Sequence, residues 1–124
     1  MLNINYGDVH DTIDLFGTFT LQLYIFVVDD TSYSYICKFY DSSDLVLQVT
    51  NVAGDNSSDT GVRLALPSTC TDVVEHINTN IKYLKLAEYI WSQLPEAEDM
   101  IDLKERITNH LNELELELNI YWWK

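Results

Sequence analysis

The sequence predicts an α+β fold in which an antiparallel sheet precedes two helices. Apolar residues alternate with polar ones in the first half of the chain and recur every three or four residues in the second half, with the change near Pro67. The short connections between the predicted strands favour antiparallel neighbours. We therefore expect a three- to four-stranded antiparallel β-meander over residues 18–66. A two-helix antiparallel hairpin over residues 71–121 would pack on one face, making residues 1–124 a single domain.

The first half contains one expected helix and four expected strands. A short helix is predicted from Asp8, a suitable N-cap, to Phe16, with Gly17 after its end. The strand patterns that follow are separated by polar segments rich in Asp, Ser and Asn, and they cover residues 18–28, 33–40, 45–50 and 62–66.

The second half shows helical periodicity. Thr71 or Asp72 can cap a helix that runs to Leu94, where Pro95 breaks it. A further helix is indicated by apolar residues spaced by three or four: Leu103, Ile107, Leu111, Leu114, Leu118 and Tyr121. The segment 114–122 also alternates as a strand would. Leu and Glu are strong helix formers and neither Gly nor Pro interrupts the run, so a helix is favoured there.

Charge is the strongest indication of function. The chain has twenty acidic and seven basic residues, and its formal net charge is −13. A net charge of magnitude about 2–8 is enough to keep a small domain soluble. Residues 1–62 contain nine aspartates and a single cation, Lys38. Because like charges repel, so large an excess suggests a positively charged partner protein. The same charge argues against nucleic acid or an anionic membrane as a direct ligand, since both are polyanions.

The sequence indicates no membrane span and no export signal. No apolar run reaches the roughly 18 residues that a span requires, and the first residues lack the cationic start and apolar stretch of a signal peptide. The expected location is the cytoplasm, or the host cytoplasm if the chain is encoded by a phage. Cys37 and Cys70 are expected to be reduced thiols.

No motif for catalysis or metal binding is present. His10 and Asp14 could share a face of the first helix, but a metal site needs three or four ligands. His76 and His110 lie on separate predicted helices without acidic or cysteine companions at metal spacing. Cys70 precedes a helix start, where a thiolate could be stabilised, but most cysteines in such positions are unreactive thiols. We expect no enzymatic activity, no cofactor and no metal.

A meander also predicts where some of the charge gathers. The turn 29–32 and the loop 52–61 would lie at one end of the sheet, and the first long helix would return to that end near Pro95. Seven carboxylates would then form an acidic pole, which is the expected partner-binding surface: Asp29, Asp30, Asp55, Asp59, Glu96, Glu98 and Asp99.

Carboxylates in a row can compete with DNA phosphates for the Lys and Arg side chains of a basic groove. The leading hypothesis is a non-enzymatic inhibitor of the DNA-mimic type, and in size and charge the chain is similar to small acidic phage-encoded anti-restriction and anti-CRISPR proteins. One alternative is an immunity protein or antitoxin that neutralises a basic nuclease toxin. Another is a phage structural or assembly factor that forms a homodimer through the helical hairpin and residues Tyr121–Trp123.

Overall fold

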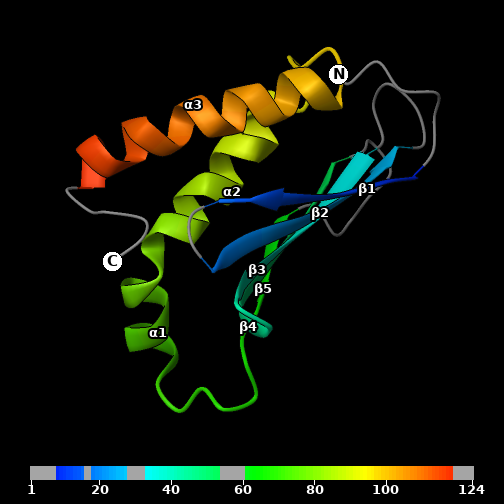
Figure 1. The fold of residues 1–124 in the computed structure, drawn as a ribbon. Coiled ribbons are helices and arrows are strands. Elements are labelled where there is room, and N and C mark those ends of the chain that lie inside the picture. The colour runs from blue at the N-terminus through cyan, green and yellow to red at the C-terminus, as the bar shows by residue number, and fades with distance from the viewer. Residues whose placement is uncertain (1–7, 16–17, 28–32, 54–60, 119–124) are drawn as a thin grey trace.

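In the described residues the fold is α+β, with a five-stranded antiparallel sheet, where three to four strands were predicted, and three helices, where two were predicted (Figure 1). The structure is a computed structural model that describes residues 8–15, 18–27, 33–53 and 61–118. The strands are β1 (Asp8–Asp14), β2 (Phe19–Val27), β3 (Tyr33–Asp41), β4 (Asp44–Ala53) and β5 (Gly61–Ala65). The helices are α1 (Val73–Thr79), α2 (Ile81–Gln93) and α3 (Met100–Leu118).

The strands lie in the order β1-β2-β3-β4-β5, and each is antiparallel to the next. The helix predicted from Asp8 to Phe16 was wrong, because residues 8–14 form β1 and pair with β2. A helix so short is marginal without tertiary contacts. As a strand the same residues gain a complete ladder with β2 and bury Ile13 in the core.

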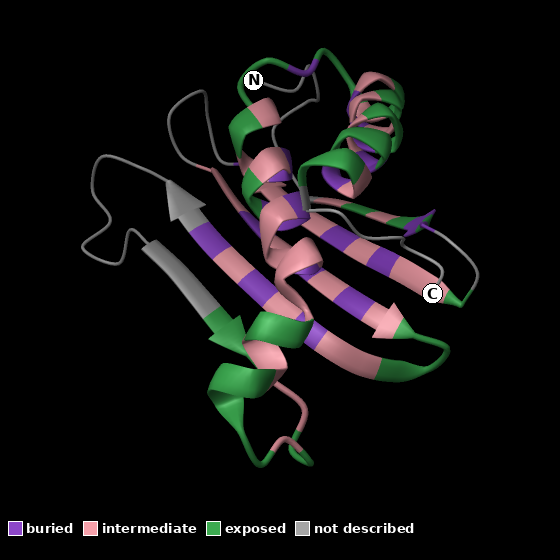
Figure 2. Ribbon diagram, turned by 90° about the vertical axis from the view of Figure 1, so that its left-hand side faces the viewer, coloured by how far each residue is buried: buried purple, intermediate pink, exposed green. Residues whose placement is uncertain are grey.

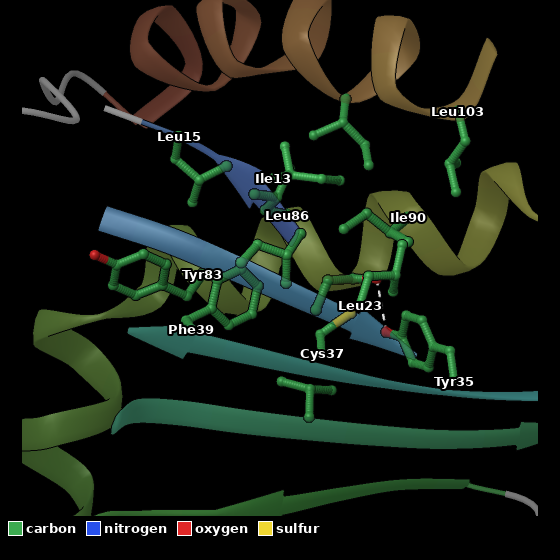
Figure 3. Close-up of a cluster of buried hydrophobic side chains, with 14 of the residues drawn as sticks. Ile13, Leu15, Leu23, Tyr35, Cys37, Phe39, Tyr83, Leu86, Ile90 and Leu103 are labelled. Atoms are coloured by element: carbon green, nitrogen blue, oxygen red, sulfur yellow. Dashed lines mark hydrogen bonds between the residues drawn. The ribbon is translucent and has the colours of Figure 1, made fainter. Parts of the chain in front are cut away.

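Strict alternation in β2 and β3 gives the sheet one buried face, visible as alternating buried residues along the strands (Figure 2). The core side chains of this face include Leu23, Cys37 and Phe39, none of which is exposed (Figure 3). α2 packs against them: the Tyr35 hydroxyl donates a hydrogen bond to the Ala87 carbonyl oxygen at 2.7 Å. The sheet and the helices thus share one core.

The helix predicted to run unbroken to Leu94 is divided into α1 and α2 at Asn80, whose φ and ψ are −111° and 25°. Asn80 Nδ2 donates to the His76 carbonyl oxygen at 2.8 Å. The same oxygen also accepts from the Asn80 amide at 3.1 Å, so backbone and side chain of Asn80 together close the end of α1. Such local side-chain bonds favour helix ends over helix interiors. The predicted cap at Asp72 is present, since its Oδ1 accepts from the Glu75 amide at 3.0 Å.

α3 continues through residues 114–118 as a helix, as favoured over a strand, whereas residues 119–122 lie outside the described part of the chain. Its buried residues join Ile13 and Leu15 in the core cluster (Figure 3). Lys104 Nζ lies 2.7 Å from Asp11 Oδ2 and so connects α3 to β1. All three helices lie over the same face of the sheet (Figures 1 and 2).

Candidate interaction surface on the helices

The predicted partner-binding residues fall into two groups. Glu96, Glu98 and Asp99 lie in the connection between α2 and α3, and all three are exposed. The other four lie in segments 28–32 and 54–60, outside the described residues: Asp29, Asp30, Asp55 and Asp59. Of the predicted acidic pole, the structure therefore describes the three residues in the α2–α3 connection.

The direction of α2 determines which end of the sheet this connection approaches. Trp91, in the last turn of α2, packs on Tyr33 and Tyr35 with ring centroids 5.1 Å and 5.0 Å apart. Tyr33 begins β3 and pairs with Val27, which ends β2. The C-terminal end of α2 thus lies at the sheet end where β2 stops and β3 starts, and this path is one condition of the predicted acidic pole.

Arg106, which was not among the predicted residues, holds the connection together. Its Nε lies 3.1 Å from Asp102 Oδ2, and its Nη1 donates to Gln93 Oε1 at 2.6 Å. Its Nη2 donates to the Glu96 carbonyl oxygen at 3.4 Å. One guanidinium therefore joins the end of α2 to the first turns of α3. The i,i+4 spacing of Asp102 and Arg106 is the sequence signal that could have identified it.

Some carboxylates near the connection have structural roles. Asp99 Oδ1 accepts from the Asp102 amide at 2.8 Å and caps the start of α3. Asp102 Oδ2 accepts from the Glu98 amide at 3.0 Å, and this bond, together with Arg106, lowers the pKa of the Asp102 carboxyl. The side chains of Glu96 and Glu98 form no hydrogen bond or ion pair with any described residue. Within the α2–α3 connection, the carboxylates of Glu96 and Glu98 are therefore available to a partner.

The helices carry far more acidic than basic side chains. Between positions 72 and 118 there are eleven Asp and Glu residues and four Lys and Arg residues. Each basic side chain already contacts an aromatic or acidic one: Lys82 Nζ lies 4.9 Å from the Phe19 ring centroid, Lys85 Nζ 3.9 Å from Glu88, Lys104 Nζ 2.7 Å from Asp11 and Arg106 Nε 3.1 Å from Asp102. The excess negative charge is therefore left for solvent or a partner to offset.

The outward face of α3 combines acidic residues with exposed apolar ones. Ile101 and Leu116 are 78% and 86% exposed. At a helical rise of about 1.5 Å per residue they lie roughly 22 Å apart, with Glu105 and Glu113 exposed between them. We call the α2–α3 connection and this face the acidic helical surface, defined by Glu96, Glu98, Ile101, Glu105, Glu113 and Leu116.

The thiols and His76 make structural contacts. Cys37 is fully buried, and burial raises the pKa of its thiol well above the usual value, which disfavours the nucleophilic thiolate. Cys70 and His76 line the same surface pocket. Each meets a backbone carbonyl oxygen, with Cys70 Sγ 3.6 Å from that of Asp72 and His76 Nε2 2.7 Å from that of Val46.

His10 and His110 also lie away from any group of possible metal ligands. The proposed shared helix face of His10 and Asp14 was wrong, because both lie on β1, where residues four apart are separated by about 13 Å. His110 stacks on Tyr89 with centroids 3.6 Å apart, and its Nδ1 lies 3.0 Å from Glu113 Oε2. Within residues 8–15, 18–27, 33–53 and 61–118, no three His, Cys, Asp or Glu side chains are grouped as a metal site would require.

Comparisons with protein-family models, with curated proteins and with solved structures found no match for the chain. Among the described helices, none has both the length and the apolar character needed to cross a membrane.

Proposed function

We propose that this chain is a small acidic, non-enzymatic inhibitor that occupies the basic nucleic-acid-binding groove of another protein. The observation that carries the proposal is the charge of residues 72–118. They include eleven acidic residues and only four basic ones, and the basic side chains are already in contact with other side chains. A groove lined by Lys and Arg would offset this charge. Complementary charge would also accelerate the encounter of the two proteins.

The acidic helical surface suits a groove better than a flat site. α3 presents a convex row about 22 Å long between Ile101 and Leu116. DNA carries one charge per roughly 1.7 Å of its axis, so a groove that binds DNA holds many cations over such a length. Carboxylates on a rigid helix compete for those cations, while Ile101 and Leu116 can bury apolar area that phosphates lack.

The predicted acidic pole is part of this proposal. The chain leaves β2 and enters β3 at the sheet end that the C-terminal end of α2 approaches. We propose that Asp29 and Asp30, between β2 and β3, and Asp55 and Asp59, between β4 and β5, extend the surface begun by Glu96 and Glu98. In this arrangement the carboxylates act together at one end of the protein, which gives a stronger local field than scattered charges do.

We place this inhibitor in the cytoplasm, where a phage-encoded anti-defence protein would meet its nucleic-acid-binding target. An immunity protein against a nuclease toxin would use the same surface and the same physics. The identity of the partner separates the two: a host defence enzyme supports the first, and a nuclease toxin encoded beside the chain supports the second.

The first experiment identifies the partner and tests competition with DNA. The protein is immobilised, a host lysate is applied at low salt, and bound proteins are eluted by raising the salt. We expect a basic nucleic-acid-binding protein whose affinity for the chain falls steeply with salt, because exposed charges are screened over a Debye length of about 10 Å at 0.1 M. A DNA duplex should displace the chain. Binding that is insensitive both to salt and to DNA would refute the proposal.

The second experiment tests the surface with charge-neutralising variants of equal size. Changing Asp29, Asp30, Asp55 and Asp59 to Asn should weaken partner binding at least tenfold, which is about 1.4 kcal/mol. Changing Glu96, Glu98 and Glu105 to Gln should also weaken it. The matched control changes Asp41 and Asp44 to Asn, because these residues pair at the other end of the sheet. If the control abolishes binding while both test variants bind as the parent does, the surface is wrongly assigned.

A further inference from the structure

The face of the sheet opposite the helices is not covered by any element in the described part of the chain (Figures 1 and 2). The register places His10, Tyr24, Ile36 and Thr50 in one row across four strands of this face. Phe26 occupies the neighbouring row on β2. A sheet face that only meets water usually carries polar side chains. Here Tyr24, Phe26 and Ile36 lie together at the centre of the sheet, and polar residues such as Thr50 surround them.

The centre of this face is ordered by its own contacts. The His10 ring stacks on the Tyr24 ring, with centroids 4.2 Å apart and planes 2° from parallel. Lys38 Nζ lies 5.2 Å from the same ring centroid. A side chain that is already fixed loses less conformational freedom on binding, so a contact through Tyr24 would have a low entropic cost.

The charge of this face differs from that of the helices. Among its described side chains it carries one carboxylate, Asp14, and one ammonium group, Lys38. The opposite side of the molecule carries the acidic helical surface. Two copies of a chain with a charge of −13 repel one another. They repel least when the sheet faces meet, where the described side chains are balanced in charge, and the acidic helices point outward.

The size of the face is sufficient for a stable dimer. Five strands spaced about 4.8 Å apart, with nine or ten residues each in β2, β3 and β4, give a surface of roughly 700 Å². A standard protein interface buries about 800 Å² on each partner and has an aromatic centre with a polar rim. We propose that the occupant of this face is a second copy of the chain, packed sheet against sheet about a twofold axis. This assigns self-association to the sheet, in place of the helical hairpin that the sequence suggested.

The oligomeric state of the full chain tests this assignment. Sedimentation equilibrium should show a monomer–dimer equilibrium between about 1 µM and about 1 mM. The dimer should strengthen as salt is added, because salt screens the repulsion between the copies. Partner binding by the acidic helical surface should weaken under the same change. The two proposals can therefore fail separately.

Matched variants locate the interface. Ile36→Glu should weaken the dimer at least tenfold, and Thr50→Glu, which spares the apolar centre and so protects the fold, should weaken it in the same direction. Ile101→Glu adds the same charge on α3, at a residue that is 78% exposed, and should leave the dimer intact. Far-UV circular dichroism checks that each variant is folded. A chain that is monomeric at every concentration and salt overturns the inference, and so does a dimer that Ile101→Glu breaks while Thr50→Glu does not.

Discussion

Removing one buried hydroxyl tests how the sheet is joined to the helices. Tyr35 on β3 is 1% exposed, and its hydroxyl donates to the Ala87 carbonyl oxygen of α2 at 2.7 Å. Tyr35→Phe deletes this bond and leaves the ring in place. A net hydrogen bond contributes about 0.5–1.5 kcal/mol, so we expect a loss of about 1 kcal/mol in the free energy of unfolding. For a chain of this length that corresponds to a fall of about 4 °C in Tm.

The pH dependence of the same variant gives a second readout. Burial raises the pKa of Tyr35 far above its usual value of about 10. The folded state therefore keeps the phenol neutral, and its stabilising effect is complete below pH 10 and is lost as the pH rises further. Each such tyrosine should cost up to about 1.4 kcal/mol of stability for every pH unit above 10. Tyr35→Phe should make the decline shallower, with Tyr83, whose pKa burial also raises, still contributing.

Urea unfolding followed by circular dichroism, at neutral pH and at several pH values above 10, provides both measurements. The control is Tyr40→Phe, which removes the same atom from a half-buried tyrosine on the uncovered face. We expect the control to change stability by less than about 0.5 kcal/mol. Equal losses in the two variants, or an unchanged alkaline slope in Tyr35→Phe, would refute the role given to the Tyr35 hydroxyl.

Three further predictions follow from packing, capping and burial. Leu23→Ala removes a side chain with no exposed area and should cost about 2–5 kcal/mol in urea unfolding, whereas Leu116→Ala, at a residue 86% exposed, should change stability by less than about 0.5 kcal/mol. Asp99→Ala should lower the free energy of unfolding by about 1 kcal/mol through loss of the α3 cap, while Asp99→Asn should retain most of it; thermal unfolding of both tests this. A thiol reagent should modify the partly exposed Cys70 promptly and Cys37 only on unfolding, so equal rates for both would contradict the burial of Cys37.

Long regular patterns were predictable from the sequence because they need little tertiary information. The alternation in β2 and β3 predicts which of their residues are buried, since successive side chains of a strand point to opposite faces. The cap at Asp72 and the helix through residues 114–118 follow from local preferences in the same way. The excess of acidic residues is a property of composition alone.

Tertiary contacts decided the rest, because short segments have weak preferences of their own. Residues 8–14 become β1 only because β2 offers a free edge and the core accepts Ile13. The division at Asn80 has no Pro or Gly signal. It ends α1, whose His76 Nε2 lies 2.7 Å from the Val46 carbonyl oxygen of β4, a contact that only the packed fold provides.

The sequence by itself determined the α+β class, the main strands and helices, and the size of the negative charge. It could not determine which carboxylates are paired with basic side chains from other elements of the fold. Lys104 contacts Asp11 only after α3 has packed beside β1. Arg106 pairs with Asp102 inside α3, but it reaches Gln93 and the Glu96 carbonyl oxygen only after α3 has packed beside α2. The tertiary structure therefore decides which charges share a face: Asp14 and Lys38 are the charged side chains described on the open sheet face, whereas the carboxylates of α3 lie on the other side of the molecule.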